Sequence, residues 1–190
     1  MTVTINGTTG IDKVQAGAIE KSDLPAGVML NVTSTLIDAT STTTNNTYIA
    51  TNIEHTISPS ATSSKVLVDI GIWHSAAKAN WTTFRLYRGI GGTFTEITAA
   101  NSTVSMPVYG TDSSGFITSG YRQSDTHEEN VLEYGRGIYL DSPNTTSPVT
   151  YKLYWRVRNG GTGYLNRAIT ASGDHLSHAP STVTLTEISG

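Results

Sequence analysis

The chain has 190 residues, with 31 threonines, 20 serines, nine tyrosines, three tryptophans, no cysteine and a net charge of −3. High net charge and few aromatic residues keep disordered segments unfolded, and this composition has neither property. The lack of cysteine excludes disulfides, thiolate zinc sites and cysteine nucleophiles. The 12 basic and 15 acidic residues give no basic surface for nucleic acid, and no apolar run approaches the roughly 18 residues of a membrane span. We expect no nucleic-acid partner and no membrane insertion.

The first 26 residues form a segment that differs from the rest of the chain. It carries few large apolar side chains and ends in Pro25-Ala26, which together with the next residue, Gly27, is a turn signal. It does not open with the basic and apolar regions of a signal peptide, so we expect none. A piece this short cannot bury a core of its own. We expect residues 1–26 to be ordered by a larger particle or by other copies of the chain, and residues 27–190 to form one domain.

From residue 28 onward the sequence reads as short strands separated by polar segments. Residues 38–47 are expected to form a loop, and residues 58–64 and 89–92 to form turns. No segment in this part carries a convincing helical pattern. We therefore predict an all-β fold, an antiparallel β-sandwich of the jelly-roll type. The predicted strands are residues 28–37, 48–57, 65–73, 81–88, 94–98, 104–109, 116–122, 131–140, 151–158, 164–170 and 181–188.

Two of these strands have the strongest alternation of side chains. In residues 65–73 every second residue from Val66 is aliphatic, and Leu67 and Trp73 on the opposite face indicate that both faces are partly buried. In residues 151–158 the alternation separates an apolar face from a basic and aromatic one. The apolar face holds Tyr151, Leu153, Trp155 and Val157, and the other holds Lys152, Tyr154, Arg156 and Arg158.

The densest group of ionisable residues is Asp125, His127, Glu128, Glu129 and Glu133. A glycosidase needs two carboxylates on either side of the scissile bond, about 5–10 Å apart. Adjacent residues of a strand point to opposite faces, so Glu128 and Glu129 do not fit that geometry. A solvated acidic loop is the favoured interpretation. We expect no catalytic residue and no enzyme activity.

A second group, Asp174, His175 and His178, has spacing that could hold a metal ion, and His55 and His74 could join it in space. Two histidines three residues apart in a loop, with no third ligand implied nearby, are weak support for a metal site. We interpret them as surface imidazoles and expect neither a metal nor a cofactor.

Aromatic residues are the remaining candidates for ligand contact, because their rings can stack on the apolar faces of sugars. Most of them are better interpreted as core or subunit-interface residues. We single out Trp81, Tyr121 and Tyr164, which lie next to loops that contain Gly or Asn. The full set that we considered is Trp73, Trp81, Tyr109, Tyr121, Tyr134, Tyr139, Tyr154 and Tyr164.

Several stretches resemble one family of virus proteins. They are residues 4–14 (TINGTTGIDKV), 57–68 (ISPSATSSKVLV), 139–146 (YLDSPNTT), 150–153 (TYKL) and 181–188 (STVTLTEI). Together they resemble tail-fibre-like virion proteins of bacteriophages, notably marine and cyanobacterial ones. These stretches mark turns and strands of a scaffold, and residues 76–133 resemble the family least.

The resemblance implies a homotrimeric β-sandwich head on a short N-terminal segment that attaches to the virion, through residues such as Ile5, Ile11 and Val14. It implies that the protein is located in the virion and acts in host-surface recognition, with other virion proteins and a host-surface polysaccharide as partners. Weak contacts from several copies can add up to firm attachment.

Three other functions remain open at this point. A capsid (head) fibre or decoration protein would have the same fold and a different place on the particle. A short capsule depolymerase would need paired carboxylates, which the sequence does not indicate. A carbohydrate-binding module of a bacterial enzyme is disfavoured because neither a signal peptide nor a catalytic partner is found in the chain.

Overall fold

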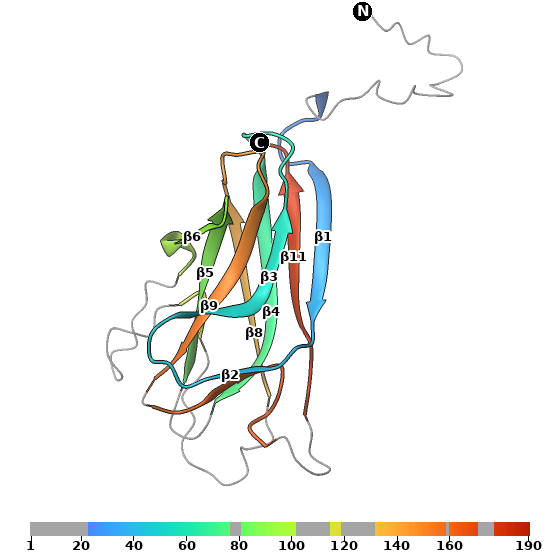
Figure 1. Cartoon of the computed structure of the whole chain (residues 1–190). Helices are drawn as coiled ribbons and strands as arrows, with labels where there is room; N and C mark the ends of the chain where they lie inside the picture. The colour runs from blue at the N-terminus through green and yellow to red at the C-terminus, as the bar shows by residue number, and fades with distance from the viewer. Residues whose placement is uncertain (1–22, 77–80, 102–114, 119–131, 159, 171–176) are drawn as a thin grey trace, which may run out of the picture.

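The computed structural model describes residues 23–76, 81–101, 115–118, 132–158, 160–170 and 177–190. Two antiparallel sheets pack against each other (Figure 1), and the described residues contain no α-helix. The predicted all-β class and antiparallel β-sandwich are confirmed. Within the described residues, no helix has the length and apolar character needed to cross a membrane.

The larger sheet has six strands, in the order β1-β11-β4-β10-β2 with β8 paired to β4. Residues 66–71 of β4 pair with β11 on one side and with β8 on the other, so β4 lies at the centre of this sheet. Among the described strands, β1 and β8 therefore lie at its opposite edges. Its strands are β1 (Met29–Ile37), β2 (Ser41–Thr43), β4 (Lys65–Ala76), β8 (Glu133–Asp141), β10 (Gly163–Leu165) and β11 (Ser181–Ile188).

The smaller sheet has five strands, in the order β3-β9-β5-β6, and β7 pairs with the first part of β5. A short 3-10 turn, η2 (Thr98–Ala100), follows β6. The strands are β3 (Ile49–Ile57), β5 (Thr82–Ile90), β6 (Thr93–Glu96), β7 (Ile117–Thr118) and β9 (Val149–Val157).

The core lies between the two sheets and is built by the alternation that the sequence predicts. The inward side chains of β4 and β9 are almost completely buried, and Phe84 and Leu86 of β5 join them. Each such side chain contributes about 1.5–3 kcal/mol, which exceeds the 0–1 kcal/mol of a typical surface ion pair. The inward residues are Val66, Val68, Ile70 and Ile72 of β4 and Tyr151, Leu153, Trp155 and Val157 of β9. Leu67 and Trp73, on the outer face of β4, are half-buried as predicted.

The observed strands differ from the predicted ones in three places. Ser41–Thr43, in the expected loop, form β2 because their backbone pairs with the short strand β10. β10 ends at Leu165 because Asn166 adopts a left-handed conformation with a φ of 59°, and its amide donates to the carbonyls of Ile37 and Ala39. The turn expected at residues 89–92 is limited to Gly91 and Gly92, both with positive φ. The predicted strand 104–109 and part of 116–122 lie outside the described residues.

A buried polar cluster joins the two sheets at one edge of the core. Asp141 of β8, with 6% of its side chain exposed, accepts hydrogen bonds from Arg88 Nη1 at 3.0 and 2.9 Å. The hydroxyl of Tyr151 donates to the same carboxylate at 2.7 Å. Burial and the neighbouring Asp141 charge raise the pKa of Tyr151 well above its usual range, so this phenol keeps its proton and remains a donor.

The N-terminal end of the domain is fastened to the end of the last strand. The N–H of Gly27 donates to the carbonyl of Ser189, and the hydroxyl of Ser189 donates to the carbonyl of Pro25. Gly27 has a φ of 89°, which places the predicted turn signal in a tight turn. In Figure 1 the C-terminus lies at the same end of the sandwich as the start of β1. The described end of this segment, residues 23–26, therefore lies next to the C-terminus.

The turn at residues 58–64 is held by a buried carboxylate of the last strand. Glu187 is 1% exposed and lies on the inward face of β11 with Val183 and Leu185. Its Oε1 accepts hydrogen bonds from the backbone N–H and hydroxyl of Ser60 and from the hydroxyl of Ser64. These charge-assisted bonds offset the cost of burying the charge.

Replacing Asp141 tests whether the polar cluster holds the sheets together. Asp141→Ala leaves Arg88 and the Tyr151 hydroxyl without their shared acceptor, and we expect the free energy of unfolding to fall by about 2–3 kcal/mol. Tyr151→Phe removes one donor only, and a loss of about 1 kcal/mol is expected. Urea unfolding followed by tryptophan fluorescence measures both. An Asp141→Ala loss no larger than that of Tyr151→Phe contradicts this role.

Candidate functional site

The outer face of the five-stranded sheet carries the basic and aromatic side chains that the alternation of β9 turns away from the core. Lys152, Tyr154 and Arg156 point outward from β9. The register places Arg85 of β5 opposite Tyr154, and Tyr87 opposite Lys152. Neither β5 nor β9 contains an acidic residue. Two adjacent central strands therefore present a basic stripe on a protein whose net charge is negative.

At one end of this stripe, two arginines make cation–π contacts with the ring of Tyr48. The guanidinium of Arg85 lies 4.2 Å from the centre of the Tyr48 ring, and that of Arg156 lies 4.7 Å from it. Burial raises the pKa of Tyr48, although the two arginines act in the opposite direction. A neutral ring in contact with both guanidiniums helps to hold the two cations in position.

Next to the cation–π contacts of Tyr48, three aromatic rings from neighbouring strands contact one another. Tyr87 and Tyr154 are stacked with ring centroids 3.9 Å apart, and Phe94 of β6 is tilted against Tyr154 at 6.3 Å. The amine of Lys152 lies 5.4 Å from the centre of the Phe94 ring. Phe94 packs over Gly89, where any larger residue would collide with the ring. The glycine therefore leaves room for the Phe94 ring over β5.

Carboxylates and an amide hold these groups in place. Glu96 accepts hydrogen bonds from Arg85 at 3.1 Å, from the Tyr87 hydroxyl at 3.3 Å and from Asn101 at 2.7 Å. Burial, followed by the charge and hydrogen bond of Glu96, raises the pKa of Tyr87. On the other side, Glu54 of β3 pairs with Lys152 at 2.7 Å. We call the whole set the aromatic–cation surface; it consists of Tyr48, Glu54, Arg85, Tyr87, Phe94, Glu96, Lys152, Tyr154 and Arg156.

An open hollow of about 500 Å³ lies at the Phe94 end of this surface. Its walls combine one aromatic ring, a proline and the glycine-rich end of β5 with hydroxyl groups and exposed backbone. The lining residues are Gly89, Ile90, Gly91, Gly92, Phe94, Ser147, Pro148 and Thr150. Apolar walls with a few polar groups are typical of sites that bind small molecules or single sugar units.

The surface and the hollow can bind a ligand that has both apolar faces and many hydroxyl groups. The side chains of the surface other than the exposed Glu54 are half-buried, so their rings and charged groups are fixed and lose little freedom on binding. Aromatic rings offer apolar contact, and Glu96, Asn101 and Arg85 offer hydrogen-bonding atoms. Sugars present this combination of apolar faces and hydroxyls.

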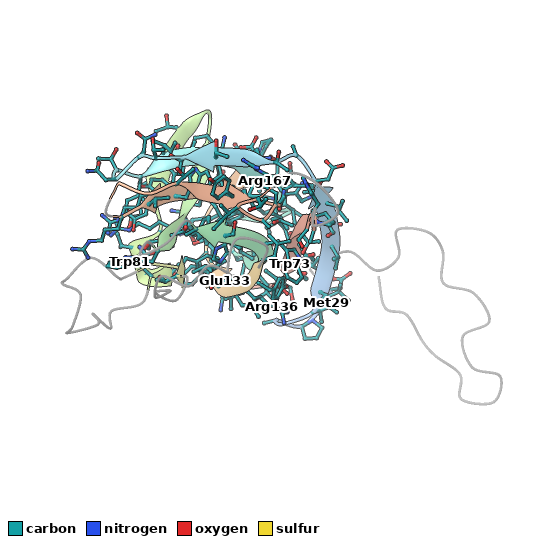
Figure 2. The ribbon with its side chains drawn as sticks, turned by 90° about the horizontal axis from the view of Figure 1, so that it is seen from below. Met29, Trp73, Trp81, Glu133, Arg136 and Arg167 are labelled. Carbon is teal, nitrogen blue, oxygen red and sulfur yellow. The ribbon has the colours of Figure 1, made fainter. Side chains whose placement is uncertain are left out.

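The three aromatic residues that the sequence singles out lie elsewhere. Trp81, just before β5, is 6% exposed and lies under the guanidinium of Arg158 at 5.2 Å. Tyr164 of β10 is half-buried and lies under that of Arg167 at 4.5 Å. Figure 2 shows Trp81 and Arg167 well apart in the view. Tyr121 and the attachment residues Ile5, Ile11 and Val14 lie outside the described residues. A ligand role for Trp81, Tyr121 and Tyr164 stays a prediction.

The described members of the two ionisable groups lie at separate places in the fold. Glu133 is on β8 and lies 3.9 Å from the buried His74 of β4, whereas His55 of β3 bonds the hydroxyl of Thr33 at 2.8 Å. His178 pairs with Arg167 in an isolated bridge. Within the described ranges, no three His, Asp or Glu side chains gather where they could hold a metal ion. The other members lie outside the described residues and are Asp125, His127, Glu128, Glu129, Asp174 and His175.

Sequence reasoning found one strand of the aromatic–cation surface and missed the others. The outward face of residues 151–158, with Lys152, Tyr154 and Arg156, is visible as an alternation of basic and aromatic residues. Tyr48 and Phe94 have no such signal, because each is one aromatic residue at the end of a different strand. Only the register of the sheet brings them to the same face.

Comparisons with known proteins give no family. No protein-family model and no curated protein matches the chain. The TNF protein Eiger from S. frugiperda is 8% identical, with a TM-score of 0.35 over 80% of this chain and 92% of that protein. VP2 of an infectious bursal disease virus subviral particle is 12% identical, with a TM-score of 0.38 over 84% of this chain and 38% of VP2. A structure of the Gx strain of that virus is 12% identical, with a TM-score of 0.28 over 87% of this chain and 38% of that chain. Values this low carry no conclusion about function.

The hydrogen bond between Glu96 and Tyr87 can be tested through the ionisation of Tyr87. Glu96→Gln removes a negative charge that disfavours the phenolate, so the pKa of Tyr87 falls toward its ordinary value. NMR of ring-labelled tyrosine as a function of pH measures this shift. Glu54→Gln, which removes the partner of Lys152, is the matched control and is expected to leave Tyr87 nearly unchanged. An unchanged titration of Tyr87 in Glu96→Gln contradicts the arrangement.

Proposed function

We propose that this chain is a structural protein of a virus particle, a tail-fibre protein that recognises a host-surface polysaccharide as a homotrimer. The observation that carries the proposal is the aromatic–cation surface with its adjoining hollow. The resemblance of five stretches of the sequence to phage tail-fibre-like proteins supports the location on a virion. The β-sandwich supports the role of a stable head domain.

The chemistry of the surface favours a polysaccharide over other ligands. Stacked Tyr87 and Tyr154, with Phe94 beside them, offer several aromatic rings for contact with sugar units. The cations of Arg85 and Arg156 add attraction for acidic or phosphorylated sugars, which many cell surfaces carry. Serine and threonine hydroxyls in the hollow supply further hydrogen bonds.

The same surface supports binding without hydrolysis. Glu54 and Glu96 are its two carboxylates, and each is engaged by a cation, Lys152 and Arg85 respectively. A glycosidase needs one carboxyl group held as an acid and a second as base or nucleophile across the sugar. Both carboxylates are already engaged by cations of the surface and are not free to take those two roles. We therefore propose recognition and not cleavage.

The N-terminal segment and the copy number complete the proposal. Residues 1–26, with Ile5, Ile11 and Val14 as contacts, attach the domain to other virion proteins. Their described end is fastened beside the C-terminus by Ser189, so the head has a fixed point of attachment. Three heads on one axis raise the effective affinity of a shallow site, because the second and third contacts become intramolecular.

Binding of the full chain to polysaccharide extracted from marine cyanobacteria tests the proposal. We expect Tyr154→Ala and Phe94→Ala each to weaken binding about tenfold, the equivalent of about 1.4 kcal/mol. Thr182→Ala, on the outer face of the other sheet, is the control and is expected to bind like the parent chain. Biolayer interferometry measures the dissociation constants. Size-exclusion chromatography of the polysaccharide should show unchanged length. Failure to bind any extract, equal binding by all variants or shortened polysaccharide chains would each contradict the proposal.

A further inference from the structure

The outer face of the six-stranded sheet collects every exposed large hydrophobic residue of the described chain. Six such side chains are between 46% and 68% exposed, and all lie on the two edge strands β1 and β8. The register connects them through β11 and β4, so they share one face of the sheet. We call Met29, Val32 and Leu36 the β1 ridge, and Tyr134, Ile138 and Leu140 the β8 ridge.

β8 carries large apolar residues on its outer face, which is the reverse of a strand whose outer face meets water. Its inward positions include Gly135 and Gly137, and its outward positions hold the β8 ridge. Ile117 and Phe116 fill the space over the two glycines, where any larger residue would collide with them. A strand at the surface normally turns its large apolar residues toward the core. The pattern of β8 indicates that its outer face is covered by another protein layer.

β1 likewise carries large apolar residues on its outer face. Thr33 and Thr35 point inward, and the hydroxyl of Thr33 bonds His55 of the opposite sheet at 2.8 Å. Val32 and Leu36 point outward on the face that they share with the β8 ridge. Both edges of the sheet thus direct most of their larger apolar residues away from the core of their own domain, and only Ile37 and Tyr139 of these strands pack against it.

The strands between the two edges carry mostly polar residues and little net charge on this face. Arg136 of β8 donates to both oxygens of Asp69, at 2.8 and 2.6 Å, so these two charges satisfy each other, and the exposed Lys65 at the start of β4 adds one positive charge. Thr182 and Thr184 of β11 lie between the ridges, and Ser34 lies on β1 between Val32 and Leu36. Figure 2 shows Arg136 and Met29 on the same side of the molecule. A face with little excess charge does not strongly select a partner of opposite charge.

The size of the apolar area fits an interface between proteins. At exposures of 46% to 68%, the six ridge residues together expose about 600 Å², so each ridge offers about 300 Å² to one contact. That amount is a large part of the apolar area in the roughly 800 Å² that each partner contributes to a stable complex, of which a little over half is apolar. The half-buried Leu67 and Trp73 on the same face add to it.

We propose that copies of this chain associate through this face, with the β1 ridge of one copy packed on the β8 ridge of the next. Two different ridges at opposite edges of a sheet make a head-to-tail contact, and such contacts cover every ridge when the rotation between neighbouring copies closes them into a ring. The internally paired charges favour an identical copy over an oppositely charged protein. The number of copies rests on the homotrimer of the proposed function.

Charged substitutions in each ridge test the proposal on the full chain. The β1-ridge variant is Val32→Asp with Leu36→Asp, and the β8-ridge variant is Ile138→Asp with Leu140→Asp. Ala50→Asp is the control, because it adds a charge at an exposed position of the other sheet. Light scattering after size exclusion at micromolar concentration should give three times 20.2 kDa for the parent chain and the control, and 20.2 kDa for each ridge variant.

Mixing the two ridge variants tests the pairing itself. Each variant keeps the ridge that the other has lost, so an equimolar mixture should form a species of two copies. Circular dichroism checks that the variants fold, and threonine at the same four positions replaces aspartate if one does not.

The outcomes separate this inference from the proposed function. If the ridge variants keep the mass of the parent oligomer, the inference is wrong while the homotrimer stands. A mixture that stays monomeric overturns the contact between the β1 and β8 ridges. A parent chain that is monomeric overturns both the homotrimer and the inference, and polysaccharide binding by such a monomer would leave the recognition function intact.

Discussion

The packing of the inward rows of β4 and β9 against each other is the interaction on which the rest of the molecule depends. Val66, Val68, Ile70 and Ile72 face Leu153 and Trp155 across the core, and all are almost fully buried. Because side chains of a strand alternate between two faces, filling the core with one face fixes what the other face presents. The outer surfaces of both sheets are therefore determined by the same rows that hold the domain together.

The two outer surfaces that result differ in their chemistry. The five-stranded sheet presents stacked tyrosines and arginines, with Glu96 fixing Arg85 and Tyr87. The six-stranded sheet presents two apolar ridges around the Arg136–Asp69 pair. A surface of fixed aromatic and charged groups suits recognition of a hydroxyl-rich ligand, and a neutral apolar one suits assembly. Much of the serine and threonine lies between these features, in turns and on outward strand positions such as Thr182 and Thr184.

Much of the fold could be predicted from the sequence, because local alternation alone determines strands such as residues 65–73 and 181–188. The sites could not, because they depend on which strands become neighbours. Asp141 receives Arg88 and Tyr151 from the opposite sheet, and Tyr48 meets Arg85 and Arg156 only through the sheet register. The alternation of β8 is visible in the sequence. Which of its two faces points into the core is not visible, because Gly135 and Gly137 can face inward only when Ile117 and Phe116 fill the space over them.

The central claim is that one outer face assembles the protein and the other remains free to bind. A crystal structure of the full-length chain in its solution assembly tests it most directly. The account predicts that Val32 and Leu36 of one copy pack on Ile138 and Leu140 of the next, with Tyr154 open to solvent. An assembly that buries the aromatic–cation surface between copies and leaves both ridges exposed would contradict it.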